Sequence, residues 1–90
     1  MEQPNIKHDE DVVAFLLLLT SSDQTEQLIR ELKEMREVLE TYLIYGEWDI
    51  LVKIKVNSLP ELTRLVMRMR KIEGVNKTST LITTQYLTNQ

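Results

Sequence analysis

The chain has 90 residues, of which 42% are hydrophobic and 28% charged, with a formal net charge of −3 and no cysteine. A chain of this length forms one small domain that buries only ~60–65% of its unfolded surface, so oligomerisation would add much to its stability. The negative charge argues against direct nucleic-acid binding, which needs an excess of Lys and Arg. The lack of cysteine excludes disulfides and thiolate metal sites and fits a reducing compartment, so we expect a cytoplasmic protein.

The N-terminal part of the sequence predicts an arm followed by a buried strand. Residues 1–10 are polar and include a proline, which is typical of a flexible arm. Residues 11–20 contain the uninterrupted apolar run Val12–Leu19, which predicts a central strand covered on both faces. Acidic residues precede this run, and it is too short to cross a bilayer, so neither a secretory signal nor a membrane anchor is expected.

A first helix is predicted over residues 24–36. Asp23 stands where a side chain can cap the free amides of the first turn, and Glu26 completes a capping box. Apolar residues then recur at helical spacing and form one stripe that can pack against a sheet: Leu28, Ile29, Leu32 and Met35.

A hairpin with a tight turn is predicted next. The second strand covers residues 38–45, and the third alternates apolar and polar residues over 50–56. Gly46, one of two glycines in the chain, is expected to adopt a positive φ in the turn between them. Glu47 and Asp49 place carboxylates beside the turn amides at this end of the sheet. They serve as turn formers or, alternatively, help to hold a small zwitterion.

The second helix and the last strand complete the predicted order. Ser58 caps the helix, with Glu61 as the capping-box acid, and Gly74 ends it. A strand rich in β-branched residues follows over 75–84, and residues 85–90 form a polar tail. The resulting order, β-α-β-β-α-β, predicts an α+β fold in which a four-stranded antiparallel sheet carries both helices on one face.

The second face of this sheet is predicted to be an interface. Two helices cover one face only, yet strands one, two and four carry apolar groups on both faces. We therefore expect a second copy of the chain to cover the other face, sheet to sheet, in a homodimer.

Few residues carry the chemistry of a catalytic or metal site. His8 is the only histidine and lies in the predicted arm, so neither a metal site nor serine–histidine catalysis is expected. The sequence has no glycine-rich phosphate loop, and no cofactor is predicted. Thr78, Ser79 and Thr80 could present hydroxyls near the hairpin turn, although threonine is also simply a good strand former.

A basic face is predicted on the second helix. Its members are Arg64, Arg68, Arg70 and Lys71. They form either a solvated helix face or a docking surface for acidic groups, for example the glutamate-rich first helix of a neighbouring subunit.

A resemblance to a known family begins at the hairpin. The segment YLIYGEWDILVKIKV, residues 42–56, resembles the effector-binding (RAM) domain of the Lrp/AsnC family of feast/famine regulators. The resemblance continues through Ser58–Leu62 and the helix end at Arg70–Val75, and it closes with Thr78–Ile82. Its most specific element is a motif in which an aspartate follows a glycine after two intervening residues. This motif leads into an alternating strand, and the Thr-x-Thr strand follows later in the chain. The likeness covers about residues 11–84, which we expect to form the ligand-binding domain.

The resemblance implies a ferredoxin-like fold whose sheets pair face to face into dimers, which assemble further into tetramers of dimers. It also implies that a small amino acid binds in clefts between dimers. Turn amides would donate to its carboxylate, while carboxylates or hydroxyls would accept from its ammonium group. By analogy, the ligand-binding positions are Tyr45, Gly46, Glu47, Trp48, Asp49, Thr78 and Thr80.

The resemblance also implies what the chain does. Full-length family members carry an N-terminal helix-turn-helix, and residues 1–10 are too few to hold one. We therefore expect a stand-alone, non-catalytic, amino-acid-sensing oligomer that binds no DNA directly. One alternative is a partner subunit that joins helix-turn-helix paralogues and modulates transcription. The other is an enzyme of the dimeric α+β barrel type, although the sheet lacks a convincing general base.

Overall fold

The computed structural model describes residues 11–84. The predicted arm (residues 1–10, with His8) and the predicted tail (residues 85–90) lie outside the described residues. In chain order the elements are β1 (Val12–Thr20), the 3-10 helix η1 (Ser22–Gln24), α2 (Thr25–Lys33), β2 (Val38–Leu43), β3 (Ile50–Val56), α3 (Leu59–Arg70) and β4 (Val75–Ile82). No helix in this part of the chain is long and apolar enough to span a membrane.

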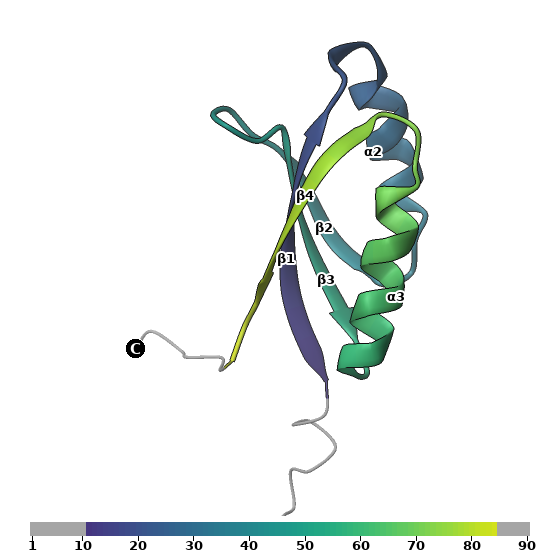
Figure 1. Cartoon of the computed structure of the whole chain (residues 1–90), viewed down its shortest axis with the longest axis vertical. Coiled ribbons are helices and arrows are strands. Elements are labelled where there is room, and N and C mark those ends of the chain that lie inside the picture. The colour runs from purple at the N-terminus through teal and green to yellow at the C-terminus, as the bar shows by residue number, and fades with distance from the viewer. Residues whose placement is uncertain (1–10, 85–90) are drawn as a thin grey trace, which may run out of the picture.

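The strands form one antiparallel sheet in the order β2-β3-β1-β4. β1 lies between β3 and β4, so its apolar run occupies the centre of the sheet, as predicted. Figure 1 shows α2 and α3 on the same side of the sheet. The predicted α+β, ferredoxin-like arrangement is therefore confirmed.

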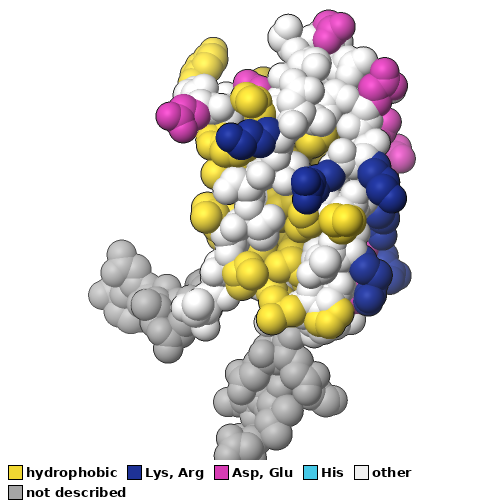
Figure 2. Space-filling model, viewed as in Figure 1, with side chains coloured by type: hydrophobic (Ala, Val, Ile, Leu, Met, Phe, Trp, Pro, Cys, Tyr) yellow, Lys and Arg dark blue, Asp and Glu magenta, His cyan; other side chains and the backbone are white. Residues whose placement is uncertain are grey.

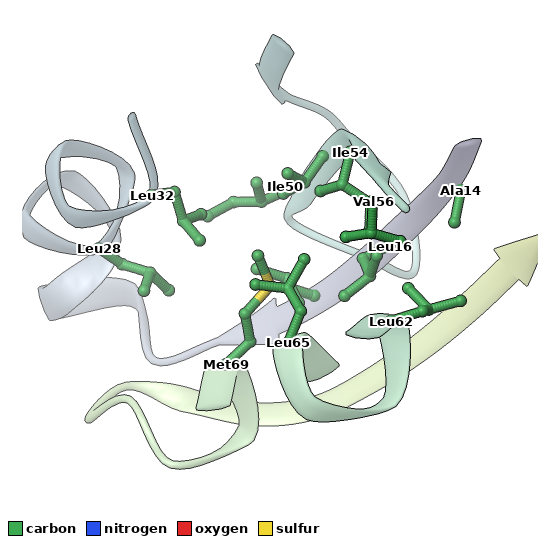
Figure 3. Close-up of a cluster of buried hydrophobic side chains, with 12 residues drawn as sticks. Ala14, Leu16, Leu28, Leu32, Ile50, Ile54, Val56, Leu62, Leu65 and Met69 are labelled. Atoms are coloured by element: carbon green, nitrogen blue, oxygen red, sulfur yellow. The ribbon is translucent and has the colours of Figure 1, made fainter. Parts of the chain in front are cut away.

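The hydrophobic core lies between the sheet and the helices. Alternate residues of β1, namely Ala14, Leu16 and Leu18, point toward the helices and are fully buried. The other core residues come from β3 and both helices (Figure 3): Leu28, Leu32, Ile50, Val52, Ile54, Val56, Leu62, Leu65 and Met69. The apolar stripes predicted for the two helices thus pack on a single face of the sheet.

The opposite face of the sheet, away from α2 and α3, has an apolar centre flanked by Lys53, Lys77 and Ser79. Between the buried residues of β1, Phe15, Leu17 and Leu19 point the other way and are only half-buried. Leu51 of β3 pairs with Leu17, and Leu81 of β4 pairs with Phe15. These five residues define the open face. Apolar groups on both faces of the central strand, as the sequence predicted, are therefore confirmed.

The start of α2 differs from the prediction. Asp23 lies within η1, and Gln24, the residue before α2, provides no side-chain cap. The chain leaving β1 is held instead by the amide of Ser21, which donates to the carbonyl of Gly74 over 2.9 Å. The carbonyl of Ser21 then accepts from the amide of Gln24, which closes a 3-10 turn ahead of the helix. α2 also ends earlier than predicted, at Lys33.

The start of α3 agrees with the prediction, but the helix ends at Arg70, before Gly74. Ser58 Oγ accepts from the amide of Glu61 over 3.3 Å, and Glu61 Oε1 accepts from the amide of Asn57 over 2.7 Å. These bonds satisfy amides that a helix start leaves free. Gly74 follows the helix with φ +101°, and a Cβ at this position would lie 2.6 Å from Gln24 Oε1. Glycine is therefore needed where the chain turns into β4.

Candidate functional site

The β2–β3 loop spans residues 44–49 and is longer than the predicted tight turn. β2 ends at Leu43, so the last residues of the predicted strand belong to the loop. The loop closes through a bond of 2.9 Å from the amide of Ile44 to the carbonyl of Asp49. A longer loop reaches farther from the sheet than a tight turn would.

The tip of this loop is open to solvent. Gly46 has φ +125° and open space around it, so the predicted positive φ is confirmed. Glu47 is exposed, and Tyr45 has a relative exposure of 104%. Figure 1 shows the loop extending from the sheet on the side away from the helices. Because these residues add nothing to the core of their own chain, they are available to a ligand or a neighbouring molecule.

Asp49 fixes the base of the loop to the end of β1. Its Oδ2 accepts from the amide of Thr20 over 2.8 Å and lies 3.3 Å from the Thr20 hydroxyl. The amide of Asp49 donates to the carbonyl of Leu18 over 2.9 Å. The structure thus gives Asp49 a positioning role in addition to the ligand contact that the sequence predicted.

Asp49→Ala is expected to lower the free energy of unfolding by about 1–3 kcal/mol, because it leaves the buried amide of Thr20 without its acceptor. Asp49→Asn keeps an oxygen that can accept this bond, so it should lower the free energy of unfolding by less. Glu47→Ala, in the same loop but exposed, is the control and should change stability by no more than ~0.5 kcal/mol. Urea unfolding followed by circular dichroism measures all three variants. A wild-type midpoint for Asp49→Ala would show that this bond does not hold the loop.

Trp48 connects the loop to the beginning of β4. Lys77 Nζ lies 5.8 Å from the centroid of the half-buried Trp48 ring, within the range of a cation–π interaction. Lys77 pairs with Leu19, so it stands on the same side of the sheet as the open face. The indole therefore packs beside the strand that carries the predicted threonines.

Thr78 and Thr80 point to the helix side of the sheet. They pair with Leu18 and Leu16, whose side chains face the helices, and opposed residues of paired strands share a face. Both threonines are half-buried. The loop tip extends on the opposite side of the sheet. Within one chain, the predicted site residues therefore fall into two groups, one on each side.

A surface pocket adjoins Thr78 where α3 ends and β4 begins. Its volume is about 370 Å³, and its lining residues are Arg70, Val75, Asn76, Lys77 and Thr78. Figure 2 shows basic side chains on the surface at this junction. Of the predicted site residues, only Thr78 lines this pocket.

The site residues that the sequence predicts do not include Arg70, Asn76 or Lys77. The sequence places Arg70 on the basic helix face and the other two in the last strand. A usable signal was present, because Gly74 brings the end of a helix back beside the start of the next strand. That turn places Arg70 close to the Thr-x-Thr segment.

The rest of the basic helix face is partly neutralised within the chain. Arg68 Nη2 lies 3.2 Å from both carboxylate oxygens of Glu37. Partial burial would raise the pKa of Glu37, but a backbone hydrogen bond and the charges of Arg68 and Arg36 outweigh it and keep the pKa below its usual value. Figure 2 shows the Lys and Arg side chains along the α3 flank. The intrachain pair favours a solvated helix face at this position.

Residues 11–84 contain no cluster of His, Asp and Glu with the geometry of a metal site. The polar groups near the loop and β4 are instead amides, hydroxyls, carboxylates and cations that can hold a charged organic molecule.

The chain is similar to a family of ligand-binding domains and to regulators that contain them. A family model described as the Lrp/AsnC ligand binding domain matches residues 13–88. An uncharacterised HTH-type transcriptional regulator of Pyrococcus abyssi is 31% identical over 85 residues, a match that covers 89% of this chain and 57% of that protein. The chain spans about half the length of the curated relatives it matches.

Solved structures of similar proteins share the fold. The hypothetical protein PHS023 from Pyrococcus horikoshii is 33% identical with a TM-score of 0.77, and the match covers 83% of this chain and 92% of that one. The transcriptional regulator NMB0573 from Neisseria meningitidis, solved as a complex with L-Met, has a TM-score of 0.83 at 16% identity. That match covers 99% of this chain and 59% of the regulator, and at this identity it shows the fold alone.

Proposed function

Because this chain belongs to the Lrp/AsnC ligand-binding domain family, we propose that it is a non-catalytic sensor that binds an amino acid and reports it through its assembly state. The observation that carries the proposal is the family match over residues 13–88. The relatives are transcriptional regulators, which supports a regulatory, effector-binding role and agrees with a protein that is not an enzyme. We place this role in the cytoplasm, where such regulators meet free amino acids.

The ligand chemistry of the proposal uses polar groups of the loop and of β4. Amides around Gly46 donate to the ligand carboxylate, and hydroxyl or carboxylate oxygens accept from its ammonium group. Thr78 and Thr80 offer hydroxyls, and Glu47 offers an exposed carboxylate. Asp49 Oδ2 is bonded to Thr20, which leaves Oδ1 for the ligand. The L-Met complex of the Neisseria meningitidis regulator is a precedent for an amino acid bound to a protein of this fold.

The separation of loop and threonines within one chain supports a site built by more than one subunit. In the proposal, dimers form through the open face, and dimers associate further, up to a tetramer of dimers. A cleft between dimers would bring the loop of one subunit to the threonines of another. A ligand bound there stabilises the assembly that contains the complete cleft, so occupancy shifts the oligomeric equilibrium.

A thermal-shift measurement against the twenty amino acids tests the proposal. One amino acid, or a small chemically related group, should raise the melting temperature, since a ligand present at 100 times its Kd adds ~2.7 kcal/mol of stability. Thr78→Val removes a site hydroxyl at constant shape and should weaken the response, while Thr63→Val, exposed on α3, should not. If no amino acid shifts the melting temperature, the sensor proposal fails.

A second candidate is a partner subunit that joins DNA-binding members of the family. It is favoured by the relatives, which are HTH-type transcriptional regulators. In this candidate the chain pairs with the ligand-binding half of a helix-turn-helix regulator and changes its promoter affinity. Co-expression with such a regulator, followed by affinity purification and native mass spectrometry, distinguishes mixed from homomeric assemblies.

A further inference from the structure

The pocket between the end of α3 and the start of β4 has the size and position of a ligand subsite. Its volume of about 370 Å³ falls within the ~300–1,000 Å³ of small-molecule sites. Thr78, proposed above as a ligand-binding residue, forms one of its walls. Asn76, another wall residue, is oriented by a bond of 3.4 Å from its Nδ2 to Ser21 Oγ.

The charge of this pocket is positive and unbalanced. Arg70 and Lys77 line it, and no lining residue is acidic. The ion pairs found within residues 11–84 join Lys55 to Asp11 and Arg68 to Glu37, so Arg70 takes part in none of them.

The acidic residue nearest to Arg70 along the chain makes its hydrogen bond elsewhere. Glu73 Oε2 accepts from Gln24 Nε2 over 3.4 Å, in the direction of α2. Lys77 also lines the pocket, although its ammonium lies 5.8 Å from the Trp48 ring. A guanidinium without an acidic partner favours an anionic group in the pocket.

Resting on the proposed function, we propose that Arg70 is the specificity-determining residue of the site and that the effector is an acidic amino acid. The α-amino and α-carboxylate groups, which all amino acids share, bind at Thr78 and the loop. The side-chain carboxylate of the effector extends into the pocket. There the planar guanidinium of Arg70 donates two parallel bonds to it. Aspartate and glutamate are the amino acids with this chemistry.

Isothermal titration with matched pairs tests the inference. Wild-type protein is titrated with aspartate against asparagine and with glutamate against glutamine. At least one acid should bind about tenfold or more tightly than its amide, as expected for charge-assisted hydrogen bonds. Arg70→Met should bring the ratio close to one, and Arg70→Lys should retain part of it because it keeps the charge without the fork.

The control is Arg64→Met, which removes an exposed arginine of the same helix that lines a different pocket. It should keep the wild-type ratio. Wild-type protein that binds amides or apolar amino acids as tightly as acids would overturn the inference and leave the sensor proposal intact. An unchanged ratio in Arg70→Met would overturn it as well. Failure of every amino acid to bind would overturn the sensor proposal and this inference together.

Discussion

Replacing Leu17 with glutamate is expected to convert the assembled protein into monomers of 10.6 kDa. Leu17 lies at the centre of the open face, opposite Leu51 on β3 and Ser79 on β4. In a sheet-to-sheet dimer this position would be buried in each subunit, where leucine contributes ~1.5–3 kcal/mol. A carboxylate there would be desolvated without a partner and would meet the same charge from the other subunit. Light scattering coupled to size exclusion measures the mass.

Two further variants separate assembly from folding. Leu81→Glu changes the open face at the edge strand, where 53% of the leucine is already exposed, so it should weaken assembly with little effect on the monomer. Thr63→Glu adds the same charge to the exposed surface of α3 and should leave the mass unchanged. If Leu17→Glu and Leu81→Glu both keep the wild-type mass and circular-dichroism spectrum, the open face is not the dimer interface.

Leu16→Ala is expected to cost about 2–5 kcal/mol of unfolding free energy, a large share of the ~5–15 kcal/mol available to a small domain. Leu16 is fully buried in the cluster formed by β1, β3 and the helices. Its truncation leaves a cavity in the centre of that cluster, which the sheet and the helices can close only in part. Urea or thermal unfolding measures the loss.

Leu17→Ala is the matched control, because the same truncation falls on the adjacent residue and the opposite face. Leu16→Ala should destabilise by a similar amount at every protein concentration. Leu17→Ala should act mainly through assembly, so its effect should grow as the concentration approaches that of dimer dissociation. If both variants lost the same unfolding free energy at every protein concentration, the two faces of β1 would not have the different environments described above.

Much of the fold could be predicted because its signals are local. The apolar run of β1 predicted a central strand, and Ser58 with Glu61 predicted the start of α3. Alternation along β3 predicted which of its residues face the core. The predictions of a tight hairpin and of a side-chain cap for α2 were wrong, because the hydrogen bonds that determine these regions join segments distant in the sequence. Ser21 bonds to Gly74, and Asp49 to Thr20.

The geometry of the site was less predictable for a related reason. Period-two alternation places Thr78 and Thr80 on one face, but only the pairing of β4 with β1 determines that this is the helix side. The resemblance located the loop and the threonines along the sequence, while their separation by the sheet required the register. The sequence places Arg70 on the helix surface, and only the turn at Gly74 indicates that Arg70 lies close to β4, with which it lines a pocket.

The central claim is an oligomer that responds to an amino acid. Its most direct test is sedimentation velocity at micromolar concentrations, with and without the amino acid that raises the melting temperature. We predict a dimer or a multiple of dimers without ligand, and a shift toward the larger species when ligand is added. A 10.6 kDa monomer that stays unchanged when the amino acid is added would contradict it.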